Sequence, residues 1–327
     1  MGLTGKWIEG VTPDSDVSDA AQRSLEARLA AVQHHLPLAA LIAEQDVEHV
    51  HRLRVATRRA VAALRLYKDF LPRRRRGELK QMLNNIRRAA GAARDLDVLT
   101  MRLMAAYGDE LGPILDEIAA RRAKAQASIH NVYEAAMKEG AAQQLMFETL
   151  ERVRPRRRRD KKRKRVLFAN WAQRRLTSTA EEFFAAQPSD SHDYLALHQF
   201  RVCGKGLRYV MELLAGAFAA DFRKEVYPRV EELQERLGTI NDHYTAAMAL
   251  SEWEQLAVSE TDAELLAQLA QQERDALETE VAEFDTWWTV ERAADLQCAL
   301  VGQYSSKKSR EPGENGAVTS GRKSSTP

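Results

Sequence analysis

The feature that most constrains the fold of this chain is an internal repeat. Shifting the sequence by 147 residues aligns 51–103 with 198–250 without a gap, and ten of the 53 paired positions are identical. A duplicated sequence predicts two copies of one structural unit, here joined through the basic stretch 152–165. The identical pairs are His51/His198, Arg54/Arg201, Val55/Val202, Leu66/Leu213, Arg76/Arg223, Glu78/Glu225, Gly91/Gly238, Asp95/Asp242, Met101/Met248 and Leu103/Leu250.

Both copies have the pattern of helices. Apolar residues recur at intervals of three and four, and proline and glycine are few. We predict an all-α protein of two pseudo-symmetric four-helix bundles, which form one helical domain with a central basic groove. The domain is expected over 16–304, with halves at about 16–153 and 154–290, and residues 1–15 and 305–327 are expected to be disordered. Predicted helices span 17–44 (with Asp16 as N-cap and a kink at Pro37), 46–71, 74–106, 112–138, 141–153, 160–187, 191–218, 222–256 and 260–288.

The helix predicted over 46–71 has one apolar face and one cationic face. At about 100° per residue, one side carries four basic residues and the opposite side carries the apolar ones. The second copy keeps this arrangement, which makes chance less plausible. The cationic faces consist of His51, Arg54, Arg58 and Arg65 in the first copy, and of His198, Arg201, Lys205 and Arg208 in the second.

The next helix of the first copy adds a second cationic stripe. Lys80, Arg87 and Arg94 fall on one side of it, together with Asn84 and Gly91. A glycine inside a helix costs roughly 1 kcal/mol relative to alanine, so a neighbouring helix or a ligand is expected to approach closely there. The equivalent stripe of the second copy has lost its cations, and we therefore expect the first half to bind more strongly. That second stripe consists of Tyr227, Glu231, Gln234, Gly238 and Asn241.

Phosphate is the ligand that suits these faces. Arginine offers a planar fork of donors to anionic oxygens, lysine a point charge, and histidine a donor whose charge depends on pH. The alternative is that the faces are solvated and form salt bridges with neighbouring helices. Glu212 lies on the second cationic face and weakens the case for binding there.

Other charged groups are assigned less specific roles. Asp95 and Asp97 diverge by about 200° on a helix and cannot chelate one ion together, so we favour an ion-pairing role for Asp95 and Asp242. His34, His35, His49 and His51 lack the spacing of a metal site, and no metal or cofactor is predicted. The basic run 156–165 fits a nucleic-acid arm, a polyphosphate contact or a solvated helix start equally well.

The net charge of +2 conceals a strong segregation of charge. Residues 51–102 hold 15 basic and 4 acidic side chains, 152–175 hold 13 and 1, and 231–295 hold 3 and 17. Massed like charges favour a polyanionic partner. The two cysteines form no CxxC motif, and neither a signal peptide nor an apolar membrane span is evident, so we expect a cytoplasmic protein.

The paired motifs resemble those of the CHAD family of histidine-bearing α-helical domains. The first copy reads H-x-x-R-V-x-x-x-R, followed 40 residues after the histidine by G-x-x-R-D, and the second reads HQFRVCGKGLRY with GTIND at the same separation. The resemblance covers about 17–290. It implies two four-helix bundles, a basic central groove, binding of inorganic polyphosphate and association with polyphosphate granules. It also implies that His51, Arg54, Arg58, His198, Arg201 and Lys205 face the ligand.

The function expected from the sequence is non-catalytic binding of inorganic polyphosphate. No Walker motif, clustered carboxylates or nucleophile–base arrangement is found, so no enzyme is predicted. The alternative is a nucleic-acid-binding protein that contacts phosphates through the same surface, and weaker nucleic-acid binding is compatible with the first interpretation. Few aromatic residues occur over 51–102, and Tyr67 and Phe70 fall on or near the core side, which disfavours base stacking.

Overall fold

A computed structural model of the chain describes residues 5–108, 112–153, 166–257 and 259–302. These residues form helices without a β-strand, which confirms the all-α prediction. The first half comprises α1 (Val17–Leu41), α2 (Glu48–Leu66), α3 (Arg73–Tyr107), α4 (Gly112–Met137) and α5 (Ala141–Leu150). The second half comprises α6 (Phe168–Ala185), α7 (Tyr194–Leu214), α8 (Tyr227–Glu254), α9 (Glu260–Trp287) and α10 (Val290–Val301). Short turns are the 3-10 segments η1 (Lys68–Phe70), η2 (Lys138–Gly140) and η3 (Ala215–Ala217) and the π-helical η4 (Phe222–Val226).

The helix boundaries follow local chemistry. Helix α1 begins as predicted at Asp16, whose side chain accepts a hydrogen bond from the backbone N–H of Ser18 at 2.8 Å. It continues through Pro37 to Leu41. Helix α10 was not predicted, because it is short and buries only Leu296 and Leu300. That i, i+4 pair, together with the N-cap Thr289, is the signal in the sequence that would have revealed it.

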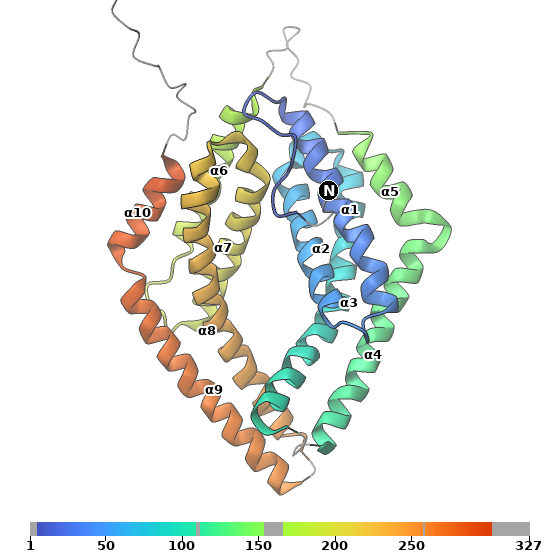
Figure 1. Ribbon diagram of the computed structural model, residues 1–327, viewed down its shortest axis with the longest axis vertical. Helices are drawn as coiled ribbons and strands as arrows, with labels where there is room; N and C mark the ends of the chain where they lie inside the picture. The colour runs from blue at the N-terminus through green and yellow to red at the C-terminus, as the bar shows by residue number, and fades with distance from the viewer. Residues whose placement is uncertain (1–4, 109–111, 154–165, 258, 303–327) are drawn as a thin grey trace, which may run out of the picture.

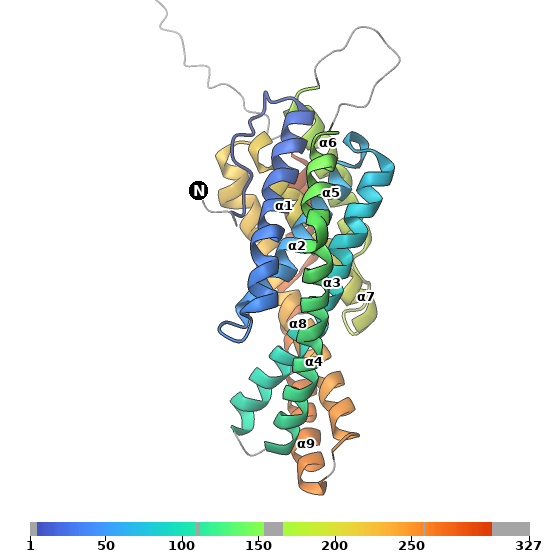
Figure 2. The same cartoon turned by 90° about the vertical axis from the view of Figure 1, so that its right-hand side faces the viewer.

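The two halves lie side by side and meet at both ends of the molecule (Figure 1). At one end, α1 contacts α6 and α2 contacts α7. At the opposite end, the ends of α3 and α4 meet those of α8 and α9, as the view turned by 90° also shows (Figure 2). Leu103, Ile118, Leu250 and Leu266 pack there in a small core of their own. The inter-half stretch predicted over 152–165 lies outside the described residues beyond Val153.

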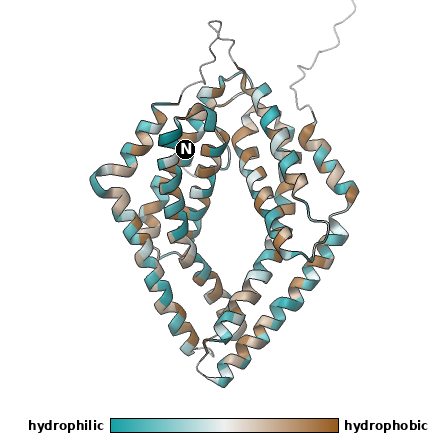
Figure 3. Ribbon diagram, turned by 180° about the vertical axis from the view of Figure 1, so that it is seen from behind, coloured by the Kyte–Doolittle hydropathy of each residue, from teal (hydrophilic) through white to brown (hydrophobic). Residues whose placement is uncertain are grey.

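A larger core fills the rest of both halves. Polar and apolar residues alternate along the helices, as amphipathic packing requires (Figure 3). The most deeply buried large side chains include Tyr67, Phe168, Phe183 and Phe200, each of which has 0% relative exposure. This core is continuous between the halves, because residues of α1, α2, α6 and α7 belong to the same cluster. The halves are therefore one structural unit.

The expectation that residues 1–15 are disordered is wrong for 5–15. This N-terminal strap buries Ile8 and Val11, and it lies against the second half of the chain. Lys6 forms an ion pair with Glu231 of α8 at 2.7 Å, and Trp7 packs edge-on against Tyr227 with ring centroids 4.8 Å apart. The strap was missed because two buried aliphatic residues are too few to establish a periodic pattern. Residues 303–327, expected to be disordered beyond 304, are outside the described part of the chain.

A buried carboxylate, Glu212, joins the two halves near this strap. Its side chain is inaccessible to solvent and accepts hydrogen bonds from Arg59 of α2 and from the Tyr227 hydroxyl, both at 3.0 Å. Arg28 of α1 lies 3.5 Å away and also donates to the backbone carbonyls of Gly5 and Lys6. Burial lowers the pKa of Arg28 to about 10, and the nearby Glu212 opposes that shift. One carboxylate of the second half thus pairs with two arginines of the first half.

Replacing this carboxylate tests its role. Glu212→Gln leaves Arg28 and Arg59 buried without a counter-charge, and breaking a buried pair on one side costs about 3–5 kcal/mol. We expect the free energy of unfolding in urea to fall by about 3 kcal/mol. The matched control is Glu117→Gln, which removes an exposed i, i+4 pair with Arg121 and should cost less than about 1 kcal/mol. Equal losses in the two variants would contradict the role assigned to Glu212.

Candidate functional site

The cationic face of α2 is directed away from the core. Leu53, Ala60 and Leu64 are buried on the opposite side of the helix, as the sequence pattern predicted. His51 and Arg65 are exposed at the two ends of this face, and Arg54 and Arg58 between them are half-buried. Arg54 and Arg58 are one turn apart, so the two guanidinium groups project from the same side.

Arg54 connects α2 to α3. Its Nη1 atom donates to the Gly91 carbonyl oxygen at 2.7 Å and to Asp95 Oδ1 at 3.0 Å. A Cβ atom added at Gly91 would meet only Arg54 Nη1, at 3.8 Å, which is ordinary van der Waals contact. The close neighbour expected at Gly91 is therefore Arg54, and space alone does not require glycine there. Arg54 has a structural role in addition to its charge.

The second half forms the equivalent contact. Arg201 of α7 lies 3.5 Å from Asp242 of α8, and the repeat aligns this pair with Arg54 and Asp95. The ion-pairing role predicted for Asp95 and Asp242 is thus confirmed. Burial lowers the pKa of Arg201, Asp242 opposes the shift, and Arg58 adds to it. Each aspartate holds one arginine in place and offsets only part of the local positive charge.

The two repeated histidines occupy equivalent positions but have different neighbours. His198 Nδ1 is 2.7 Å from Asn241 Oδ1. The pKa of His51 is lowered first by partial desolvation of its ring and then by Arg94, the residue aligned with Asn241. Glu48 lies 3.5 Å from Arg94 and opposes this effect on His51. Where the first half has a cation beside its histidine, the second half has a neutral amide. This difference matches the weaker second stripe expected from the sequence.

Cations from both halves converge where α2 packs against α7. Arg58 of α2 is close enough to Arg201 and Lys205 of α7 to lower the pKa of both. We call Arg58, Arg201 and Lys205 the central cluster. Neither Arg58 nor Lys205 has a hydrogen-bond or ion-pair partner among the described residues. Burial, followed by Arg201 and Arg58, lowers the pKa of Lys205 from 10.5 to about 7, and Asp242 opposes this only in part.

Three of the predicted site residues, Arg65, Lys80 and Arg87, lie apart from the central cluster, whereas Arg208 borders it one turn after Lys205 on α7. Arg208 stacks over the Tyr209 ring, 5.5 Å from its centroid. Burial acts to lower the pKa of Arg208, but Tyr227, Tyr209 and Glu212 outweigh burial and raise it. Arg65, Lys80 and Arg87 are exposed on α2 and α3 and bind no other described residue. They extend the positive surface but do not converge with the cluster. Glu212 was expected to weaken the cationic face of α7, but its charge is taken up by Arg28 and Arg59 in the interior.

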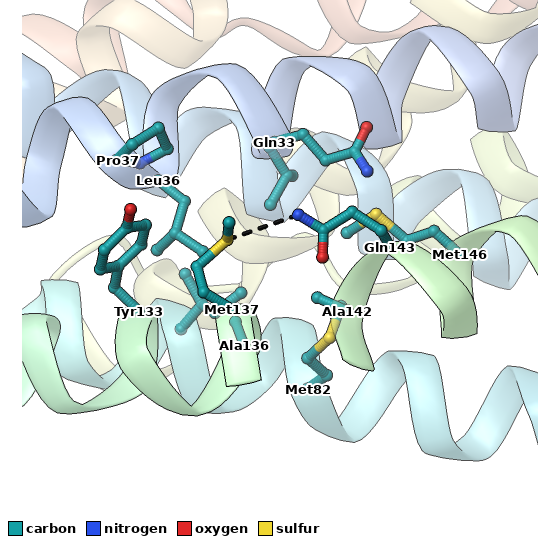
Figure 4. Close-up of a pocket in the computed structure, with 12 residues that line it drawn as sticks. Gln33, Leu36, Pro37, Met82, Tyr133, Ala136, Met137, Ala142, Gln143 and Met146 are labelled. Carbon is teal, nitrogen blue, oxygen red and sulfur yellow. Dashed lines mark hydrogen bonds between the residues drawn. The ribbon is translucent and has the colours of Figure 1, made fainter. Parts of the chain in front are cut away.

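An apolar cavity elsewhere in the first half is lined by none of these cations. It has a volume of about 150 Å³ and lies between α1, α3, α4 and α5 (Figure 4). Met82, Met137 and Met146 line it, and the Gln143 amide donates to Met137 Sδ at 3.4 Å. Its walls carry no charged side chain, so it is unsuited to an anion. Within the described ranges, no group of three or more His, Cys, Asp or Glu side chains could hold a metal ion.

Comparison with known proteins agrees with this architecture. The model of the CHAD domain family matches residues 23–251, which is more than half of the chain. The chain belongs to the CHAD family. No curated protein matches it significantly. None of the described helices has the length and apolar character needed to cross a membrane.

Two solved structures share the fold at low sequence identity. The CHAD domain from the plant Ricinus communis is 21% identical, with a TM-score of 0.59, and the match covers 90% of this chain and 95% of that one. PptA from Streptomyces chartreusis is 17% identical, with a TM-score of 0.62, and the match covers 84% and 99%. At these identities the likeness establishes the fold, and the ligand has to be argued from the side chains of this CHAD protein.

The crowding of the central cluster should cost stability. A lysine with a lowered pKa destabilises the folded state below that pKa, and the cost disappears as pH rises towards the unfolded value near 10.4. We expect Lys205→Met to raise the free energy of unfolding at pH 7 by about 1 kcal/mol once solvent screening is allowed for. Urea unfolding at pH 7 and pH 10 measures it, and the gain should vanish at the higher pH. Lys124→Met, at an exposed position on α4, is the control and should change little.

Proposed function

We propose that this CHAD protein binds inorganic polyphosphate at the central cluster, without catalysing its breakdown. The observation that supports this most directly is the convergence of Arg58, Arg201 and Lys205 from two halves of the chain. Their summed positive charge exceeds the single negative charge of the nearby Asp242. Two of the three have no partner among the described residues. Such an arrangement is unfavourable until an anion enters.

The donors of the cluster suit phosphate oxygens. Two guanidinium groups offer planar forks of N–H donors, and the ammonium group of Lys205 adds a point charge. Asp95 and Asp242 hold Arg54 and Arg201 in place, which reduces the entropy lost when a ligand binds. The CHAD family, which the sequence resemblance links with polyphosphate, provides the second line of support.

The surface around the cluster favours a chain of phosphates over a single one. Lys80, Arg87 and Arg94 recur every seven residues along α3, which corresponds to about 10 Å of helix for each step. Arg94 is beside His51 and 3.5 Å from Glu48, and Lys80 and Arg87 are exposed on the same helix. A linear polyanion anchored at the cluster would continue along α3. On α8 the corresponding row offers little, because Tyr227 and Gln234 are buried and Glu231 is paired with Lys6.

A binding role is favoured over catalysis by the same contacts. Asp95 of α3 and Asp242 of α8 are each engaged by an arginine, and among the described residues they belong to no group of carboxylates that could hold a metal ion. We further propose that the protein acts in the cytoplasm and associates with polyphosphate granules. Incubation with long-chain polyphosphate, with and without Mg²⁺, tests the non-enzymatic part, and release of phosphate above a buffer control would overturn it.

Nucleic acid remains the second candidate, because phosphate contacts alone would serve it as well. Aromatic residues of this region disfavour it. Tyr67 is buried and stacks on Trp171 with centroids 5.3 Å apart, and Phe70 packs edge-on against the same ring. Neither is available to stack on a base. Competition at equal phosphate concentration separates the two ligands: displacement of polyphosphate by RNA or DNA would favour the nucleic-acid interpretation.

Arg58 is the sharpest test of the binding site, because it has no structural partner among the described residues, whereas Arg54 holds the Gly91 carbonyl. Charge-assisted hydrogen bonds contribute about 1.5–3 kcal/mol, so Arg58→Gln should weaken polyphosphate binding about 10- to 100-fold. The slope of log affinity against log salt should also fall by about one. Calorimetric titration at several salt concentrations measures both quantities.

The control for this test is Arg274→Gln on α9. Arg274 is exposed and bonds to Gln271, away from the central cluster, and its replacement changes the net charge equally. We expect its affinity and salt slope to stay within twofold of the unaltered protein. If Arg58→Gln and Arg274→Gln weaken binding to the same extent, the central cluster is not the site.

A further inference from the structure

The apolar cavity between α1, α3, α4 and α5 has no part in the proposed binding of polyphosphate (Figure 4). Its floor consists of side chains that are almost inaccessible to solvent, namely Val32, Leu36, Ile86 and Met146. Met137 and Gln143 also line the cavity but are exposed, so they lie at its edge towards solvent. A small molecule from solvent would enter past these two side chains.

A tight turn between α4 and α5 builds this edge. Glu139 and Gly140 both have left-handed backbone conformations, with φ of 53° and 68°. In an uninterrupted helix, residues six positions apart diverge by about 120° and are separated by about 9 Å along the axis. With the turn between them, Gln143 Nε2 lies 3.4 Å from Met137 Sδ and donates to it. The turn thus brings an amide donor to the edge of the cavity.

Volume and lining restrict what the cavity can hold. Apolar cavities of about 150 Å³ exclude water and admit a ligand of the size of benzene. The cavity of this protein has that volume, about 150 Å³. No charged side chain is among its lining residues, so a charged ligand would lose its hydration without gaining a counter-charge. A ligand of this cavity is therefore small and neutral.

The methionine sulfur atoms and the Gln143 amide narrow the class of ligand further. Met82, Met137 and Met146 line the cavity from α3, α4 and α5, and methionine sulfur makes favourable contacts with aromatic rings. A thioether is only a weak hydrogen-bond acceptor, so the Gln143 amide loses little when an oxygen atom of a ligand replaces Met137 Sδ as its acceptor. These contacts together favour an aromatic ring that carries one oxygen atom.

We propose that this cavity is a binding site for a small neutral aromatic molecule with one oxygen acceptor, of the size of phenol. The ring lies against the buried floor and among the three methionine side chains, and its oxygen accepts a hydrogen bond from Gln143. The site is separate from the central cluster, because none of Arg58, Arg201 and Lys205 lines the cavity. The inference therefore goes beyond the proposed function and does not depend on it.

The experiment titrates phenol into the full chain labelled with ¹³C at its methionine methyl groups, and NMR follows the methyl signals. We expect the signals of Met82, Met137 and Met146 to shift along one saturable curve, because the ring current of phenol acts only at short range. Met101 and Met248, which are exposed on α3 and α8, are the internal reference and should not shift. Absence of a shift at the three cavity methyl groups, or equal shifts at all five, would overturn the proposal.

Filling the cavity should remove binding. Ala142→Leu enlarges a buried side chain of the lining, and we expect it to weaken phenol binding at least about tenfold, because the enlarged side chain takes the place of the ring. Ala141→Leu makes the same change at the neighbouring exposed position of α5 and should leave the affinity within about twofold. Should Ala142→Leu not fold, Ala136→Val narrows the cavity from α4 and gives the same test. Equal affinities in the filled variant and in Ala141→Leu would contradict the proposed site.

Two ligands of equal size test the hydrogen bond. Toluene has a methyl group where phenol has a hydroxyl group, so it reports the fit of the ring alone. Loss of a neutral hydrogen bond corresponds to about a 2- to 10-fold change in affinity, and Gln143→Leu should lower the ratio of phenol affinity to toluene affinity by that factor. Gln144→Leu, at an exposed position of α5 outside the lining, is the control and should leave the ratio unchanged. An unchanged ratio in Gln143→Leu would overturn the hydrogen bond assigned to Gln143.

Discussion

Repulsion between cations is the constraint on which this structure depends. Duplication places an arginine- and lysine-bearing helix in each half, and the fold packs these helices, α2 and α7, against each other. The contact is possible because Glu212 supplies a buried negative charge to Arg59 of α2 and Arg28 of α1. The Tyr227 hydroxyl completes the environment of that carboxylate. Compensation occurs on the core side of the contact, and the side that bears Arg58, Arg201 and Lys205 is left with excess positive charge.

Contacts at both ends of the molecule hold the halves that carry those cations together. The strap at 5–15 and the Glu212 network join the halves at one end, and the apolar contact between α3, α4, α8 and α9 joins them at the other. At that second end, Glu273 also binds both Arg102 of α3 and His243 of α8. A cation cluster that cannot relax by separation relaxes by losing a proton or by gaining an anion. The lowered pKa of Lys205 and the proposed binding of phosphate are two responses to the same repulsion.

The sequence predicted the parts of this structure that follow from periodicity. The helical class, most helix boundaries and the opposed faces of α2 and α7 need only the spacing of residues along one helix. A metal site shared by Asp95 and Asp97 could be excluded, because residues two apart on a helix diverge by about 200°. That left an ion-pairing role for Asp95 and for its counterpart Asp242. The sequence could not show that Arg54 binds a carbonyl while Arg58 has no such partner, since that depends on how α3 lies against α2. Glu212 was placed on the ligand side for the same reason, because only the packing of α1 and α2 reveals its partners.

One aligned position decides along which half of the protein a bound polyanion would lie. Arg94 and Asn241 occupy equivalent places beside His51 and His198. Arg94 lowers the pKa of His51, whereas Asn241 Oδ1 accepts a hydrogen bond from His198. A polyanion that reaches the central cluster therefore meets continued positive charge along α3, and along α8 it meets neutral or acidic groups. Binding energy should accumulate in one direction only, from the cluster towards Lys80. A ligand bound in this way would lie along the first half of the protein, with the second half contributing the arginine and lysine that anchor it at the junction.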